Sequence, residues 1–141
     1  MKTKKLFLVI CLCFVIAALC FCGCGGTSTS GDYATLEEYF DQNPDMQEVF
    51  GESESSIEGT TYECAVSGND LLYNFTYIEQ VPDDQVEAVA LEVEESQDGA
   101  QEGIQTLVDT MEELTGIEGV RVVVSFYNSD GSLIWSYSIP E

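Results

Sequence analysis

Histidine is absent from the sequence, and only 4 Lys+Arg residues stand against 26 Asp+Glu, for a formal net charge of −22. The lack of His excludes Ser-His and Cys-His nucleophile chemistry and removes the commonest zinc ligand. The shortage of basic residues excludes most nucleic-acid binding, because contacts with a phosphate backbone need Lys and Arg. A length of 141 residues indicates one domain, and 45% hydrophobic residues indicate a folded chain despite the charge.

The six cysteines are concentrated near the N-terminus, where five of them lie at or before Cys24. Cys64 is the only one in the rest of the chain, so an intramolecular disulfide or a multi-cysteine metal site is excluded there. Cys64 alternates with Tyr62 and Val66 on one face of a predicted strand. We therefore expect a buried core thiol rather than a reactive one.

The N-terminal segment has the pattern of an export signal. Lys2, Lys4 and Lys5 precede residues 6–22, which contain no charged residue. A basic region followed by an apolar run of this length is typical of a secretory signal peptide. A retained membrane anchor is the alternative, because the run is near the lower limit for spanning a bilayer.

Residues 21–24, Phe-Cys-Gly-Cys, resemble a bacterial lipobox, in which the cysteine is acylated with chains such as palmitate and becomes the first residue. Phe21 departs from the usual Leu. The Gly/Ser/Thr-rich stretch that follows is typical of a flexible tether. We expect a signal peptide over residues 1–23, a lipidated Cys24 with its linker over 24–32, and one extracellular α+β domain over 33–141. That domain would be held on the outer face of the cytoplasmic membrane.

Periodicity predicts the elements of this domain. Thr35 and Glu38 are spaced as a capping box that opens a short helix, and a second helical turn runs from Pro44 to Phe50. Residues 51–59 are predicted to form a loop. Residues 60–66 and 71–78 form a β-hairpin around Gly68-Asn69. This turn pairs Val66 with Leu71, Cys64 with Tyr73 and Tyr62 with Phe75.

A long helix is predicted from Pro82 to Gly116, since apolar residues recur there at helical spacing. Gly99 and Gly103 weaken its middle and allow a kink or a break near Asp98-Gly99. Its predicted apolar positions are Val86, Val89, Ala90, Val93, Ala100, Ile104, Leu107, Val108, Met111 and Leu114.

Residues 120–127 and 133–139 form a second hairpin around 128–131. A four-residue loop, which pairs Phe126 with Leu133 and Val124 with Trp135, is preferred over a three-residue loop because it keeps the apolar sets on one face. The predicted fold is α+β in two layers, with the order α-ββ-α-ββ. One long helix covers a four-stranded, mainly antiparallel sheet whose hairpin order is open.

The sequence contains only weak indications of a catalytic or metal site. Adjacent acids such as Glu94-Glu95 point about 100° apart on a helix, so they are interpreted as solvated surface. Residues 128–131 resemble the end of a calcium loop, but Phe126 would occupy its first ligand position. We interpret them as a turn, and predict no catalytic residue, metal site or cofactor.

Two features remain as candidate binding surfaces. Tyrosines on the helix-facing side of the sheet could line a groove, although core packing is the favoured interpretation. The opposite face would present a contact surface if nothing covered it. Its members would be Val123, Tyr127, Ile134, Leu72 and Ile78. Arg121 shares that face and is expected to form a surface ion pair with Glu63 or another acid.

The chain resembles a family of small lipoproteins of Gram-positive bacteria. The resemblance is carried by residues 24–26, the stretch Ala34-Thr35-Leu36-Glu37-Glu38-Tyr39-Phe40, the aromatic strand pair and the closing hairpin at Asp130-Gly131. That family is functionally uncharacterised, so the resemblance implies surface attachment and the α+β order but no site residue.

The residues favour a non-enzymatic, lipid-anchored, acidic interaction module at the cell surface. Its partners would be the membrane, through the lipid, and cationic peptides, basic proteins or weakly held divalent cations. The alternatives are a small-ligand or peptide carrier with a pocket between helix and sheet and, more remotely, a hydrolase that uses carboxylates alone.

Overall fold

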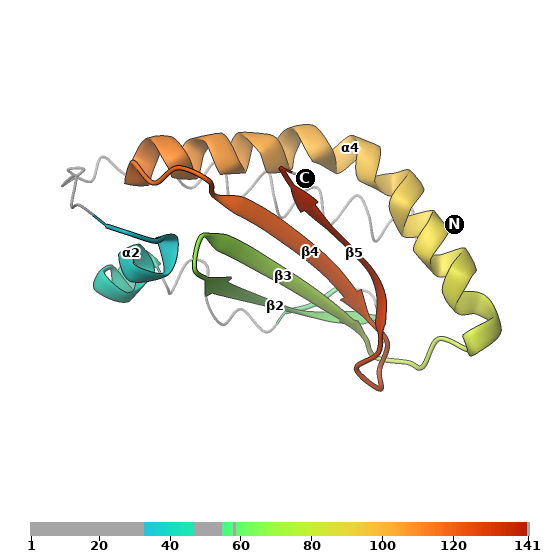
Figure 1. Cartoon of the computed structure of the whole chain (residues 1–141). Helices are drawn as coiled ribbons and strands as arrows, with labels where there is room; N and C mark the ends of the chain where they lie inside the picture. The colour runs from blue at the N-terminus through green and yellow to red at the C-terminus, as the bar shows by residue number, and fades with distance from the viewer. Residues whose placement is uncertain (1–32, 47–54, 58, 141) are drawn as a thin grey trace.

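The computed structural model describes residues 33–46, 55–57 and 59–140. Its elements are α2 (Leu36–Gln42), β1 (Ser55–Ile57), β2 (Thr60–Ser67), β3 (Asp70–Tyr77), α4 (Asp83–Thr115), β4 (Arg121–Tyr127) and β5 (Leu133–Ile139). Figure 1 shows α4 arched along one face of the sheet, with α2 beside the turn between β2 and β3. The predicted α+β class and α-ββ-α-ββ order are confirmed. The predicted signal peptide, Cys24 and tether lie outside the described residues.

The sheet has the order β1-β2-β3-β4-β5. Its pairings are antiparallel except that of β3 with β4, which is parallel, so the sheet is mainly antiparallel, as predicted, with one parallel pairing. A parallel neighbour requires a long crossover, and α4 provides it by carrying the chain back from the end of β3 to the start of β4. The prediction of a loop over residues 51–59 is wrong in part, because residues 55–57 pair with β2 as a short edge strand.

The first hairpin has the predicted register, with Val66 opposite Leu71, Cys64 opposite Tyr73 and Tyr62 opposite Phe75. Gly68 at φ +60 supplies the positive φ that a primed two-residue turn requires. The preferred register of the second hairpin is wrong by two residues. Val124 lies opposite Tyr137 and Phe126 opposite Trp135, while a bulge at Phe126/Tyr127 shifts Leu133 to face Tyr127. Ile134 is the extra, unpaired residue of this bulge, and the other apolar residues of the two strands remain on one face.

α4 is one continuous helix of 33 residues, so no break interrupts it at Gly99. It ends as predicted at Gly116, whose φ of +71 is left-handed and whose N–H donates to the Glu112 carbonyl. Only the C-terminal half of its predicted apolar stripe is buried, namely Ala100, Ile104, Leu107, Val108 and Met111. In the N-terminal half Val86, Val89, Ala90 and Val93 are half-buried. Leu114, in the last turn of the helix, is exposed.

The hydrophobic core lies between the sheet and the two helices. Leu36 and Phe40 of α2 and the buried stripe of α4 pack in one cluster with the same face of the strands. The strand members of that cluster are Cys64, Leu71, Phe75, Val122, Val124, Phe126 and Ile139. At the centre, the rings of Phe75 and Phe126 stack with centroids 5.0 Å apart.

Candidate functional site

Acidic side chains dominate the surface. Among those that the structure describes, all but Asp70 and Glu112 are exposed. Residues 24–141 contain all 26 acids and one basic residue, Arg121, which makes 1 − 26 = −25. α4 alone has eleven Asp or Glu and no Lys or Arg in its 33 residues. The domain therefore presents a strongly negative field that internal cations do not offset.

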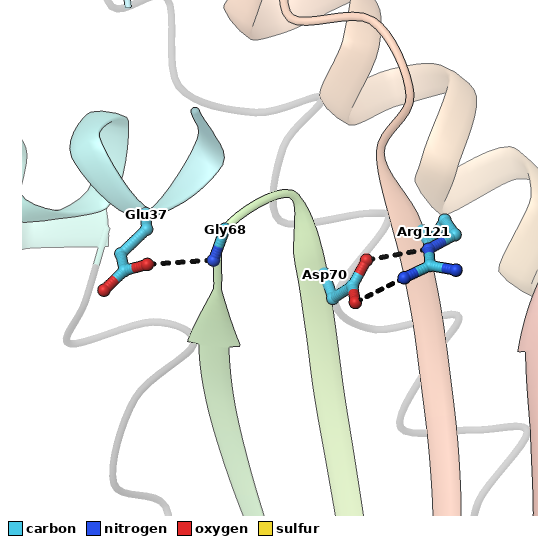
Figure 2. Close-up of polar contacts among 4 residues, drawn as sticks. All are labelled: Glu37, Gly68, Asp70 and Arg121. Carbon is cyan, nitrogen blue, oxygen red and sulfur yellow. Dashed lines mark hydrogen bonds and ion pairs between the residues drawn. The ribbon is translucent and has the colours of Figure 1, made fainter. Parts of the chain in front are cut away.

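Arg121 is held by Asp70 rather than by Glu63. Its Nε and Nη2 donate to Asp70 Oδ1 and Oδ2 at 2.8 and 2.7 Å, a bidentate pair that joins the starts of β3 and β4 (Figure 2). The hydrogen bond and charge of Asp70 raise the pKa of Arg121. The prediction of a surface ion pair is confirmed, because half of the Arg121 side chain is exposed. Arg121 is therefore a structural cation and not a free anion-binding group.

The turn between β2 and β3 ties three segments together. Glu37 and Gly68 exchange two hydrogen bonds. The Glu37 N–H donates to the Gly68 carbonyl at 2.8 Å. The Gly68 N–H donates to Glu37 Oε2 at 2.9 Å, the bond drawn in Figure 2. Asn69 Oδ1 accepts from the Leu36 N–H at 3.0 Å, and its Nδ2 donates to the Glu118 carbonyl. The turn thus holds the start of α2 and the segment before β4.

The two sheltered carboxylates have structural partners. Asp70 binds Arg121, as described above. Glu112, in the last turn of α4, accepts on Oε1 from the N–H groups of Gly119 and Val120 at 2.8 and 3.2 Å. A hydrolase acid needs a raised pKa, whereas hydrogen bonds from Ser132 lower the pKa of Asp130. The described carboxyl groups supply no observation in favour of acid-base catalysis.

The loop after β4 is a turn organised by the side chain of Asn128. Asn128 is 1% exposed; its Oδ1 accepts from the N–H groups of Val81 and Ser129 at 2.8 and 3.0 Å, and its Nδ2 donates to the Val81 carbonyl at 2.9 Å. Asp130 Oδ1 accepts from the Ser132 N–H and hydroxyl. Within the part of the chain that the structure describes, no three His, Cys, Asp or Glu side chains are grouped so as to hold a metal ion.

Cys64 is a core thiol, as predicted. It is 7% exposed, and burial raises its pKa to about 12, with the hydrogen bond from Tyr73 acting in the opposite direction. A buried thiol with a raised pKa carries little thiolate at neutral pH, which is typical of a structural cysteine rather than of a nucleophile.

The predicted contact face is only partly assembled. Leu72 and Val123 are register partners and half-buried, and Tyr127 lies opposite Thr76 farther along. Ser125 and Ser136 interrupt the apolar surface with a 2.9 Å hydrogen bond. Ile134 packs against the core cluster instead, and Ile78, 56% exposed, lies beyond the end of β3. Ile134 therefore does not belong to the predicted face, and Ser125 lies between Val123 and Tyr127 along β4.

The aromatic side chains mostly belong to the core. Tyr62, Tyr73, Tyr77, Trp135 and Tyr137 pack partly buried against the core cluster, in agreement with the favoured interpretation. At the end near the start of α4, Tyr77 Oη is buried and has no hydrogen-bond partner among the described residues. Burial and the charge of Glu92 raise the Tyr77 pKa.

The chain belongs to a family described as a domain of unknown function (DUF4854), whose model matches residues 36–139. This match runs from the start of α2 to the end of β5, so the family corresponds to the whole described fold. No curated protein and no solved structure matches the chain. No helix in the described ranges is both long enough and apolar enough to cross a membrane.

Sequence reasoning missed Asn69 and Asn128 as organising residues. Both stand at turns, where Asn is common for local reasons, and their long-range roles are encoded only by the fold. The signal that was available is that each lies directly beside a predicted strand end, where a side-chain amide can satisfy backbone groups of a neighbouring segment.

Proposed function

We propose that this chain is a non-enzymatic, lipid-anchored interaction module that binds cationic peptides or basic proteins at the outer face of the cytoplasmic membrane of a Gram-positive bacterium. The observation that carries the proposal is the uncompensated acidity of the domain: the one cation of residues 24–141 is already paired, and nearly all described acids are exposed. Such a field attracts cations and repels anionic lipids and polymers.

The anchoring step is supported by the sequence pattern around Cys24. Cleavage before Cys24 and acylation of its thiol would leave residues 25–32 as a tether. The intact mass of the membrane-extracted chain tests this: a chain that begins at a diacylated Cys24 supports the proposal. Cys24→Ala should abolish the lipid mass, whereas Cys22→Ala should leave it. An unmodified chain that begins at Met1 would contradict it.

Binding is tested with the full chain in a non-ionic detergent, titrated calorimetrically with a Lys-rich peptide and with the same peptide carrying Gln for Lys. The proposal expects binding of the Lys peptide alone, and a strong loss between about 50 and 500 mM salt, where screening shortens the range of these interactions. Equal binding of the two peptides, or no binding at low salt, would contradict it. Divalent cations should compete weakly.

One observation supports a second candidate, a carrier of a small ligand or peptide beside the aromatic residues. Tyr77 Oη is buried without a partner next to the half-buried part of α4, where a bound polar atom would satisfy it. Trp135, the one Trp of the chain, lies on the same face and would report occupancy by fluorescence. Loss of the ligand-induced change in Trp135 fluorescence in the Tyr77→Phe variant, with the fold retained, would support the carrier function.

A further inference from the structure

The two edges of the sheet differ in a way that matters for binding. One edge is β1, a strand of three residues. The other is β5, with seven residues and the sequence LIWSYSI, which contains no charge and no proline. Proteins usually protect exposed edges by shortness, charge, proline, a bulge or a covering element. β5 is not short and has neither charge nor proline, and its one bulge lies at Ile134, near its start. No strand of the described part of the chain pairs with its outer side.

α4 lies above this edge, packed mainly on β5 and β4 (Figure 1). Its orientation follows from helix geometry, since successive residues turn by about 100°. Met111, fully buried, marks the side that faces the sheet. Glu92 projects about 100° from Met111 on one side of the helix. Its carboxylate lies close enough to Tyr77 of β3 for its charge to raise the pKa of that tyrosine. That flank of α4 therefore faces the interior of the sheet.

The opposite flank faces away from β3 and overhangs the outer side of β5. Glu87 and Glu94 project there, about 100–120° from Met111 in the other direction, and both are exposed. They lie two helical turns apart, so they form a row along the helix rather than a pocket. A chain that added to the β5 edge would thus run beneath a row of carboxylates.

We propose that the outer edge of β5 binds an extended cationic peptide as an added strand, with the exposed carboxylates on the overhanging flank of α4 selecting basic side chains. Backbone hydrogen bonds to β5 would supply strand pairing, and charge complementarity would select the sequence. The proposal rests on the proposed function and assigns it a place and a ligand conformation. A second copy of this chain is disfavoured as occupant, because edge-to-edge pairing would bring two acidic helices together.

The probe is a peptide of about eight residues that alternates Lys and Val, tested against the full chain in detergent by calorimetry. Two further peptides carry N-methyl groups on alternate backbone nitrogens, one set at the Lys residues and the other at the Val residues. Methylation removes donors on one side of a strand only and leaves the charge unchanged. Strand addition predicts that one methylated peptide loses about tenfold or more in affinity, while the other binds as the parent does.

Two charge-matched variants locate the site. Glu87→Gln/Glu94→Gln removes two charges from the flank above β5. The control Glu95→Gln/Glu102→Gln removes two from the side of α4 turned away from the sheet, where both residues are exposed. The first variant should weaken the parent peptide about tenfold and the control less than about threefold, a difference near 0.7 kcal/mol.

Equal affinity of the two methylated peptides, or equal weakening by the two variants, would overturn strand addition while leaving salt-sensitive binding and the proposed function intact. Absence of binding by all three peptides at low salt would overturn both proposals. Dimerisation of the chain, with the peptide excluded by the dimer, would assign the β5 edge to a second copy and also overturn the proposal.

Discussion

Arg121 and Asp70 face each other at the start of two parallel strands, joined by two hydrogen bonds of 2.8 and 2.7 Å. Arg121 is the only basic residue after the N-terminal lysines, so this pair is the one side-chain ion pair that residues 24–141 can form. It lies at the surface and serves to align β4 with β3. The remaining acids therefore depend on solvent, salt or a partner for their counter-charge.

Charge repulsion within the domain predicts that salt stabilises it. Screening at about 0.5 M NaCl should raise the melting temperature of the chain, because repulsion among exposed carboxylates weakens while the single ion pair loses little. Arg121→Gln should lower the melting temperature at low salt, and the loss should shrink at high salt. Thermal unfolding followed by circular dichroism checks both. A melting temperature that falls as salt rises would contradict this account.

Glu112 and Glu113 are neighbours with opposite predicted effects. Glu112→Gln weakens the charge-assisted hydrogen bonds to the N–H groups of Gly119 and Val120, and should cost about 1–2 kcal/mol of unfolding free energy. Glu113 is exposed in the same last helical turn, where a negative charge opposes the helix dipole. Glu113→Gln should stabilise by about 0.3–1 kcal/mol. Urea unfolding of both variants tests the pair, and a shared sign would contradict the structure.

Asn128 should be among the most sensitive polar positions. Asn128→Ala leaves the Val81 N–H and carbonyl without their side-chain partner in a buried site, for an expected cost of about 3 kcal/mol. Asn128→Asp keeps the acceptor but places a carboxylate against the Val81 carbonyl, and should be equally damaging. Ser129→Ala is the control, because its hydroxyl bonds only the exposed Gln80 side chain; a change within about 0.5 kcal/mol is expected. Comparable losses of unfolding free energy in all three variants would contradict a specific role of the Asn128 side chain in holding Val81.

Cys64 predicts a loss of stability at high pH. Its folded pKa of about 12 lies above the ordinary thiol value of 9.0, so its contribution is fully present below pH 9 and is lost as pH rises toward 12. The slope should approach about 1.4 kcal/mol per pH unit for this one group. Tyr39 and Tyr77, whose pKa values are also raised, add in the same direction.

The control for this prediction is Cys64→Ala. It should be less stable at neutral pH, because a buried side chain is truncated, but its stability should fall less steeply between pH 9 and 11. The native thiol should also react with a disulfide reagent only after unfolding. Rapid native-state labelling at neutral pH would show that Cys64 is not the buried thiol of the structure.

Much of this fold could be predicted from local pattern. The first hairpin was predictable because the two-residue turn at Gly68 and the alternation of apolar residues specify the same register. α4 was predictable because its apolar spacing and Gly116 terminator are both local signals. The register of the second hairpin was not predictable, because a bulge at Phe126/Tyr127 keeps the same alternation of apolar residues with a different loop length.

The candidate surface was harder to predict. The alternation of apolar residues places Ile134 on the same face as Val123, but Ile134 is the extra residue of the bulge near the start of β5, and its side chain contacts the core. The parallel pairing of β3 with β4 depends on where α4 returns the chain, and that places β5 rather than β2 at the long edge. Long-range contacts such as that of Asn128 with Val81 also have no local signature.

The central claim is that a lipid-anchored acidic domain recruits cationic partners to a membrane. Neutral phosphatidylcholine vesicles carrying the processed chain should co-sediment a fluorescent Lys-Val peptide at about 50 mM salt and release it at about 500 mM. The Cys24→Ala chain should leave the peptide in the supernatant, since it carries no anchor. Vesicles that recruit no peptide at low salt, although they carry the folded chain, would contradict the account.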